Sequence, residues 1–250
     1  MERDALVSWL DAFLRVEEIP DASQNGLQVE GRPEVSKVGA AVDASLKTFE
    51  DALDQGVDFL IVHHGLFWGR PEMVVGPLRR RLERLFAGGI NLYAAHLPLD
   101  LHPEVGNNAV LARALGLSEL EPFGRHQGLF LGFKGRFPMA QRLHDIADAI
   151  GRLTGMQALV HQGGSDLVKT AAVVSGSGSG FIAEAAREGL DLLITGEPKH
   201  AAFHEPFEWG INVLYAGHYD TEVFGVKALA ERIAGEFGLP WVFLDHPTGL

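Results

Sequence analysis

The sequence contains no cysteine, which excludes disulfides, thiolate metal sites and thiol nucleophiles. It also lacks any apolar run close to the roughly 20 residues that a membrane-spanning helix needs. Its acidic N-terminus, "MERDALVSWLDAFLRVEEIPDA", has neither the basic start nor the long apolar stretch of a secretory signal. From these absences we expect a cytoplasmic protein that does not associate with membranes.

Basic residues are scarce as well. The chain has 21 Lys and Arg against 33 Asp and Glu, which gives a net charge of −12. Nucleic-acid-binding proteins gain affinity by neutralising phosphates with basic side chains, so we expect no nucleic-acid partner. The 250 residues are enough for one large domain or two smaller ones with sizeable cores.

Short apolar runs alternate with amphipathic segments along almost the whole chain. "KVGAAVDAS" predicts a strand, "LKTFEDALDQG" a helix that ends at Gly56, and "VDFLIVHH" a second strand. Similar pairs of segments follow. This alternation is typical of an α/β fold with largely parallel strands.

A weak internal repeat relates the two halves of the chain. "GVDFLIVHHG" at 56–65 resembles "GLDLLITGEP" at 189–198, and "GINLYAAH" at 89–96 resembles "GINVLYAGH" at 210–218. Any two strand–helix units look alike, so convergence is one explanation, but the shared "GIN" and the closing histidine favour duplication. We therefore predict two linked α/β lobes of similar βαβ topology, 1–125 and 126–250.

Polar side chains gather where the predicted strands end. Ligand sites of open α/β sheets form beyond the carboxyl ends of the strands, so these side chains are candidates for one site. They are His63 and His64, His96 and Asp100, Thr195 and Glu197, and His218, with Glu222 four residues further on.

The residue types point to a metal site. Imidazoles combined with carboxylates suit Zn, Fe, Mn, Co or Ni, and the sequence does not distinguish these metals. Adjacent side chains of a strand point to opposite faces, so His63 and His64 can serve one ion only past the end of the strand, or can serve two neighbouring ions. A carboxylate from Asp100 or Glu222 could bridge two metals roughly 3.5–4 Å apart.

Four motifs then give a specific resemblance. They are "SQNGLQVEG" at 23–31, "VHHGLFW" at 62–68, "HLPLDLHPEVGNN" at 96–108 and "GHYDTE" at 217–222. With them the sequence resembles the Nif-three-like family of GTP cyclohydrolase I type 2 homologues over essentially its whole length. In the first motif "DASQN" and Glu30 depart from the family pattern, which bears on the substrate-facing loop and leaves the metal ligands intact.

The resemblance implies a dinuclear centre, with two divalent metal ions per chain between the two lobes. The segment 213–250 would return two of the ligands to this centre. It also implies a ring-shaped homohexamer. The ligands that the resemblance implies are His63, His64, Asp100, His218 and Glu222.

We interpret the chain as a dinuclear metal-dependent hydrolase of a small molecule, and the family name suggests GTP ring opening as its activity. The alternative is a metal-binding regulatory or metal-handling protein without turnover, which the same five ligands would serve. An open coordination position beside a polar pocket would favour the hydrolase.

Three further features carry open alternatives. We expect His96 to orient a ligand, with direct ligation as the alternative. Glu197 either serves the site as a general base or caps the segment "PKHAAF". We expect "SGSGSG" at 175–180 to form a tight turn, with anion binding by its amides as the alternative.

Overall fold

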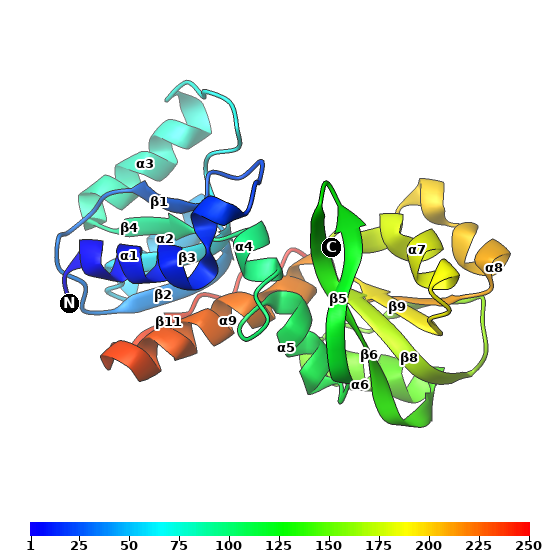
Figure 1. Cartoon of the computed structure of the whole chain (residues 1–250). Helices are drawn as coiled ribbons and strands as arrows, with labels where there is room; N and C mark the ends of the chain where they lie inside the picture. The colour runs from blue at the N-terminus through cyan, green and yellow to red at the C-terminus, as the bar shows by residue number, and fades with distance from the viewer. The chain divides into compact units, whose positions relative to one another are not determined.

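The computed structural model describes residues 1–250, and its internal contacts divide the chain into two compact units. Unit 1 comprises Met1–Val105 and Gly225–His246, and unit 2 comprises Gly106–Phe224 and Pro247–Leu250. Each unit combines one β-sheet with helices (Figure 1). The predicted α/β class and the two lobes of similar topology are confirmed.

Unit 1 is built on a five-stranded sheet in the order β1-β4-β3-β2-β11. β1 is antiparallel to β4, and the remaining neighbours are parallel. The strands are β1 (Gly26–Val29), β2 (Val38–Asp43), β3 (Phe59–His64), β4 (Asn91–Ala94) and β11 (Trp241–Phe243). The helices are α1 (Arg3–Leu14), η1 (Val16–Glu18), α2 (Leu46–Asp54), α3 (Gly76–Gly88) and α4 (Leu97–Asp100).

Helices cover both faces of this sheet, which explains why β3 reads as an unbroken apolar run. On one face Leu60 and Val62 pack in a buried cluster with Phe49 of α2 and Leu82 of α3. On the other face lies Tyr93, whose hydroxyl donates a 2.7 Å hydrogen bond to Asp11 of α1. Parallel strands that are buried on both sides can support polar residues only where they end.

Unit 2 is built on a six-stranded sheet in the order β5-β6-β8-β9-β10-β7. Its strands are β5 (Ser118–His126), β6 (Leu129–Arg142), β7 (Leu159–Gln162), β8 (Leu167–Val174), β9 (Leu192–Thr195) and β10 (Asn212–Tyr215). Its helices are α5 (Asn107–Ala114), α6 (Leu143–Thr154), η2 (Gly178–Phe181), α7 (Ile182–Arg187), η3 (His200–Ala202) and α8 (Glu205–Trp209). Helix α9 (His218–Phe237) begins in unit 2 and continues into unit 1.

The alternation of side chains along β9 separates the two faces of this sheet. Leu192 and Ile194 pack in one cluster with Ile146 of α6, and Leu193 packs in another with Ile182 of α7. The strands β7-β10-β9-β8 of unit 2 follow the same pattern as β1-β4-β3-β2 of unit 1. In both sets an antiparallel edge strand precedes three parallel strands.

The internal repeat extends to buried polar groups. Asp58 accepts hydrogen bonds from the backbone amides of residues 36–37, and Asp191 accepts them from the amides of residues 169–170. Both carboxylates therefore tie the start of one parallel strand to the start of the next. A charged oxygen that accepts several amide hydrogen bonds compensates the cost of its own burial.

The asparagines of the two "GIN" motifs are equivalent in the same way. Asn91 accepts a 2.7 Å hydrogen bond from the amide of Gly31, and Asn212 accepts a 3.0 Å bond from the amide of Gly164. Each side-chain amide also donates to the backbone carbonyl of the aspartate of its own unit. These matched contacts favour duplication over convergence as the origin of the repeat.

The division between the units differs from the expected position at residues 125/126. It falls at 105/106, because Ser118–His126 forms a hairpin with β6 and so belongs to the second sheet. The segment that returns to unit 1 is 225–246, whose strand β11 pairs with β2, whereas His218 and Glu222 remain in unit 2.

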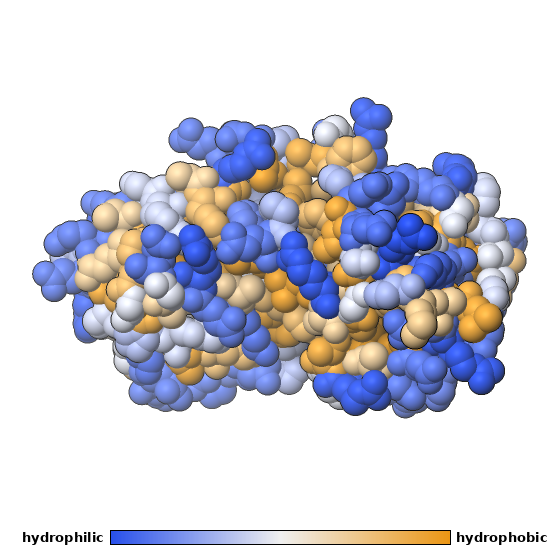
Figure 2. Space-filling view, turned by 60° about the horizontal axis from the view of Figure 1, so that its bottom comes forward, coloured by the Kyte–Doolittle hydropathy of each residue, from blue (hydrophilic) through white to orange (hydrophobic).

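None of the helices combines the length and the apolar character that crossing a bilayer requires. On the face drawn in Figure 2, hydrophilic and hydrophobic residues are interspersed over each unit.

Candidate metal centre

His63 and His64 are the last two residues of β3. His63 is fully buried, whereas His64 is partly exposed. The next residue, Gly65, lies where the structure leaves no room for a side chain. A β-carbon at this position would lie 2.5 Å from the side-chain amide of Gln28 and 2.6 Å from the β-carbon of Ala94. Gly65 is therefore required by close packing beneath the two histidines.

A third imidazole joins this pair. His96 follows β4, and the possible ligand atoms of His63, His64 and His96 all lie within 4.8 Å of one another. The ring of His63 lies 4.8 Å from that of His64 and 5.0 Å from that of His96. Trp68 covers the group, since its ring lies 5.1 Å from that of His96 and 6.0 Å from that of His64.

Each of the three imidazoles is oriented by an oxygen at its Nδ1 atom. His63 Nδ1 lies 2.9 Å from the carbonyl oxygen of Ala95, and His64 Nδ1 lies 2.9 Å from Asp43 Oδ1. An oxygen acceptor fixes the proton on Nδ1 and presents the basic Nε2 to a metal, which is the usual support of histidine ligands. The three Nε2 atoms are thus the candidate donors.

His96 has the most elaborate support. Its Nδ1 lies 3.0 Å from Asp21 Oδ2, and its backbone amide donates a 2.7 Å hydrogen bond to Asn25 Oδ1. Burial would raise the pKa of Asp21, but the hydrogen bonds from His96, Asn25 and the Leu97 amide lower it well below the ordinary value. The carboxylate beside His96 is therefore ionised, and Asn25 holds the backbone of His96 in place.

Asp100 lies at the end of the short helix α4, four residues after His96. It is only 7% exposed, and its Oδ2 lies 3.6 Å from His63 Nε2. The structure thus brings together three of the sequence-predicted residues of unit 1, His63, His64 and Asp100, and it adds His96 to them.

Unit 2 gathers the other predicted residues around the start of α9. His218 Nδ1 lies 3.1 Å from Glu197 Oε2, and His218 Nε2 lies 3.1 Å from Glu222 Oε1. The hydrogen bond with Glu222 raises the pKa of His218 to about 9, against the opposing effect of burial. Two carboxylates around one imidazole produce a negative field that favours a cation. Glu197 supports His218 as Asp43 supports His64, so it contacts a candidate ligand instead of only capping the next segment.

The "SGSGSG" segment forms one wall of this group. Gly176 has a φ of +61°, and a β-carbon there would lie 2.4 Å from Glu222 Oε1. Its carbonyl accepts hydrogen bonds from the amides of Gly196 and Glu197. The segment is thus a tight turn that fits around Glu222 and joins two strand ends, as expected.

The donor chemistry fits a transition metal. Four histidines, each with Nδ1 bound to a carbonyl or carboxylate oxygen, accompany two buried carboxylates, Asp100 and Glu222. Imidazole and carboxylate donors suit divalent Zn, Fe, Mn, Co and Ni. The supports Asp21 and Asp43 were not predicted from the sequence. The position of Asp43 could have been predicted. It is the last residue of the strand "VGAAVD", which lies beside β3, and it pairs with His64 at the end of β3.

Replacing Asp43 with alanine is expected to lower metal affinity 10–100-fold, because His64 would lose the partner that fixes its orientation. Asp43 is partly exposed, and within unit 1 its carboxylate contacts only His64. The substitution should therefore change the melting temperature little. Asp191→Ala is the matched control. It removes a structural carboxylate and should lower the melting temperature without changing metal affinity. Metal titration measures the affinity of both variants, and thermal denaturation measures their melting temperatures. Equal metal affinity in Asp43→Ala and wild type would contradict the role of Asp43.

The family model Duf34/NIF3 (NGG1p interacting factor 3) matches residues 1–248. A protein from Deinococcus radiodurans named "GTP cyclohydrolase 1 type 2 homolog" is 55% identical over 248 residues, covering 99% of this chain and 94% of that protein. A relative of the same name from Pyrococcus abyssi is 45% identical over the full length of both chains.

The fold also matches solved structures. The crystal structure of TTHA1606 from Thermus thermophilus is 60% identical, covers 100% of both chains and superposes with a TM-score of 0.94.

Proposed function

Because this chain belongs to the Duf34/NIF3 family, we propose that it binds two divalent metal ions and hydrolyses a small molecule. The proposed ligands are His63, His64, Asp100, His218 and Glu222, with His96 as a further candidate. The observation that carries the proposal is the set of four histidines whose Nδ1 atoms are held by oxygens. This support leaves Nε2 as the metal donor in every case.

The proposed ligands are divided between the two units. Unit 2 offers one histidine and one carboxylate at the start of α9, because Glu197 is engaged with His218 at Nδ1. We propose that both units supply ligands to the two ions, and that Asp100 and Glu222 would be their carboxylate ligands. Asp21, Asp43 and Glu197 would hold the histidines in place, which is a positioning role.

When bound, a pair of divalent ions lowers the pKa of a metal-bound water to near neutrality and polarises a carbonyl or phosphoryl group. We propose a water molecule as the nucleophile, because the chain lacks two common protein nucleophiles. It has no cysteine that could act as a nucleophile, and it has no G-x-S-x-G motif for a serine nucleophile. Trp68 beside His64 and His96 shields the group from water on one side, which strengthens electrostatic interactions there.

Metal analysis of the purified protein, followed by an activity screen, tests the proposal. We expect about two metal ions per chain and turnover of at least one member of a panel of phosphoesters, nucleotides and cyclic amides. GTP belongs in the panel because of the name of the relatives. A chelator should abolish turnover, and the metal should restore it.

The same experiment separates the alternative function. Full metal content without turnover of any compound would favour a metal-handling or regulatory protein. Absence of metal from protein made in supplemented medium would contradict both functions. The closed homohexamer, the cytoplasmic location and the lack of a nucleic-acid partner stay predictions.

A further inference from the structure

A cavity of about 430 Å³ lies in unit 1. Its walls come from the segment that leads into β1 and from the loop between β3 and α3. The residues that matter for its chemistry are Gln24, Asn25, Gln28, Phe67, Arg70 and Glu72. A volume of this size is within the range of small-molecule sites.

Two residues that line the cavity also hold the backbone of the segments that carry the histidines. Asn25 lines the cavity and accepts the hydrogen bond from the backbone amide of His96. Gln28 lines it too, and its Oε1 accepts a 2.7 Å hydrogen bond from the amide of Leu66, two residues after His64. A molecule in the cavity would therefore lie next to the proposed metal ligands.

Most polar groups of the cavity are already occupied within the protein. Asn25 bonds to Asp21 and to His96, and Gln28 bonds to Leu66 and to the carbonyl of Gln24. The side chains of Gln24, Arg70 and Glu72 are exposed and make no hydrogen bond or ion pair within the protein. These three groups are the ones that a bound molecule would meet.

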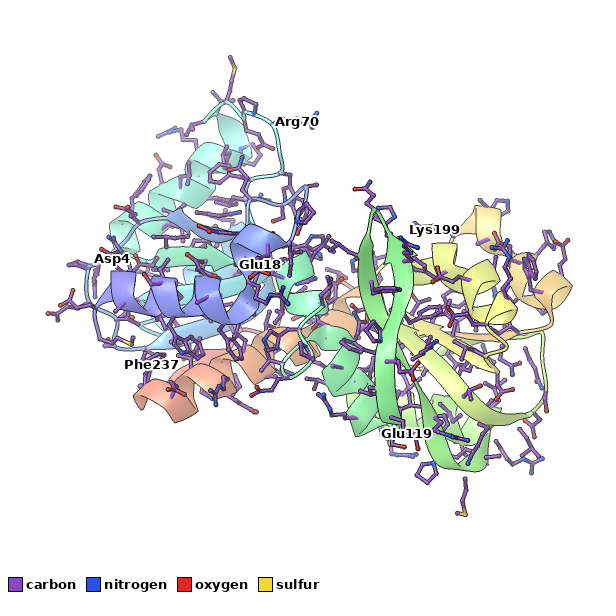
Figure 3. All side chains as sticks on the ribbon, in the orientation of Figure 1. Asp4, Glu18, Arg70, Glu119, Lys199 and Phe237 are labelled. Atoms are coloured by element: carbon purple, nitrogen blue, oxygen red, sulfur yellow. The ribbon has the colours of Figure 1, made fainter.

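Arg70 is the group that sets the class of ligand. It lies on the loop between β3 and α3 (Figure 3). Many exposed arginines of this chain pair with an acidic side chain, as Arg79 does with Glu83 and Arg142 with Asp166. Arg70 has no such partner, although the chain carries 33 acidic residues. A guanidinium binds phosphate and carboxylate groups in a bidentate manner.

Phe67 completes the site. Its ring is partly exposed and lines the same cavity as Arg70 and the amide of Gln24. An aromatic ring of the ligand can stack on Phe67, because offset aromatic pairs are favourable beyond the area that they bury.

We propose that this cavity binds the substrate of the metal centre, and that Arg70 pairs with an anionic group of that substrate, a phosphate or a carboxylate attached to a flat ring. The inference rests on the proposed function, since it takes the metal centre as the reacting part of the site. Arg70 is a specificity-determining residue in this arrangement, and the ring lies on Phe67.

Binding of phenyl phosphate to the full, metal-loaded protein tests this proposal. Isothermal titration would compare wild type with Arg70→Gln, Arg70→Lys and the matched control Arg79→Gln. Arg79 is exposed on α3 and lines no part of the cavity. We expect Arg70→Gln to weaken binding at least tenfold, Arg70→Lys to weaken it less, and Arg79→Gln to leave it unchanged. Benzoate in place of phenyl phosphate shows whether the anion is a carboxylate, and phenol should bind to none of the proteins.

Metal analysis of each protein keeps the two proposals distinguishable. If Arg70→Gln retains its metal and binds phenyl phosphate and benzoate as wild type does, the role of Arg70 is wrong and the metal centre stands. If wild type binds neither probe at millimolar concentration, the cavity is not the substrate site. If wild type holds no metal, the proposed function fails, and the comparison of Arg70→Gln with Arg79→Gln still decides whether Arg70 binds the anion.

Discussion

Replacing both histidines at the end of β3 with alanine is expected to reduce the metal content from about two ions per chain to well below one. His63 and His64 supply two of the three imidazoles whose ligand atoms lie within 4.8 Å of one another. His96, the one imidazole of this group that remains, would lack the partners that make chelation effective. Elemental analysis of protein produced in metal-supplemented medium measures the effect.

Loss of stability has to be separated from loss of ligands, because His63 is fully buried. His161→Ala is the matched control. His161 is also buried, at 8% exposure, and packs against Phe203 and Tyr215 in unit 2, away from every proposed ligand. It should lower the melting temperature and keep its metal. The variant His63→Gln/His64→Gln retains most of the volume, so full metal content in this protein would contradict the assignment of the pair.

Glu222→Gln is expected to lower metal affinity by more than the 10–100-fold that loss of a supporting residue costs. Glu222 is 3% exposed, and its Oε1 lies 3.1 Å from His218 Nε2. The neutral amide is a poorer metal ligand, and it removes one negative charge from a site that would hold about four positive charges. Without that charge the pKa of His218 should fall from about 9 toward its ordinary value.

The fold should survive this change, because glutamine has the same shape as glutamate. Circular dichroism and metal titration of Glu222→Gln measure the two properties separately, with Glu231→Gln on the exposed side of α9 as the control. A carboxylate whose only role is a favourable interaction with the helix dipole would contribute on the order of 0.3–1 kcal/mol to stability and nothing to metal binding. Unchanged metal affinity together with a lost fold would therefore show that Glu222 is structural.

The sequence predicted the parts of the site that depend on local pattern. The apolar run before His63 and His64 identified a strand end, and the strands of α/β sheets end at one edge. The repeated "GVD"/"GLD" and "GIN" segments revealed two similar lobes, and the resemblance to the Nif-three-like family is confirmed by the match over residues 1–248. In each case neighbouring residues carried the information.

Contacts between distant segments were not predicted. Asp21 lies 75 residues from His96 in sequence, and no local pattern relates the two. The strand Ser118–His126 was not predicted. Pro122 and Gly124 break local strand propensity, whereas pairing with β6 stabilises the strand. The expected division at 125/126 therefore falls within the segment that begins the second sheet.

The pairing of β11 with β2 has a consequence for synthesis of the chain. Unit 2 is inserted between the two segments of unit 1, so all strands of its sheet have been synthesised before Trp241–Phe243 is made. Until then the outer edge of β2 has no neighbouring strand, and an open edge is a place where chains aggregate. The protein therefore passes through a stage in which its second sheet can be complete while its first is still open, and the strand that closes the edge is the last one to be translated.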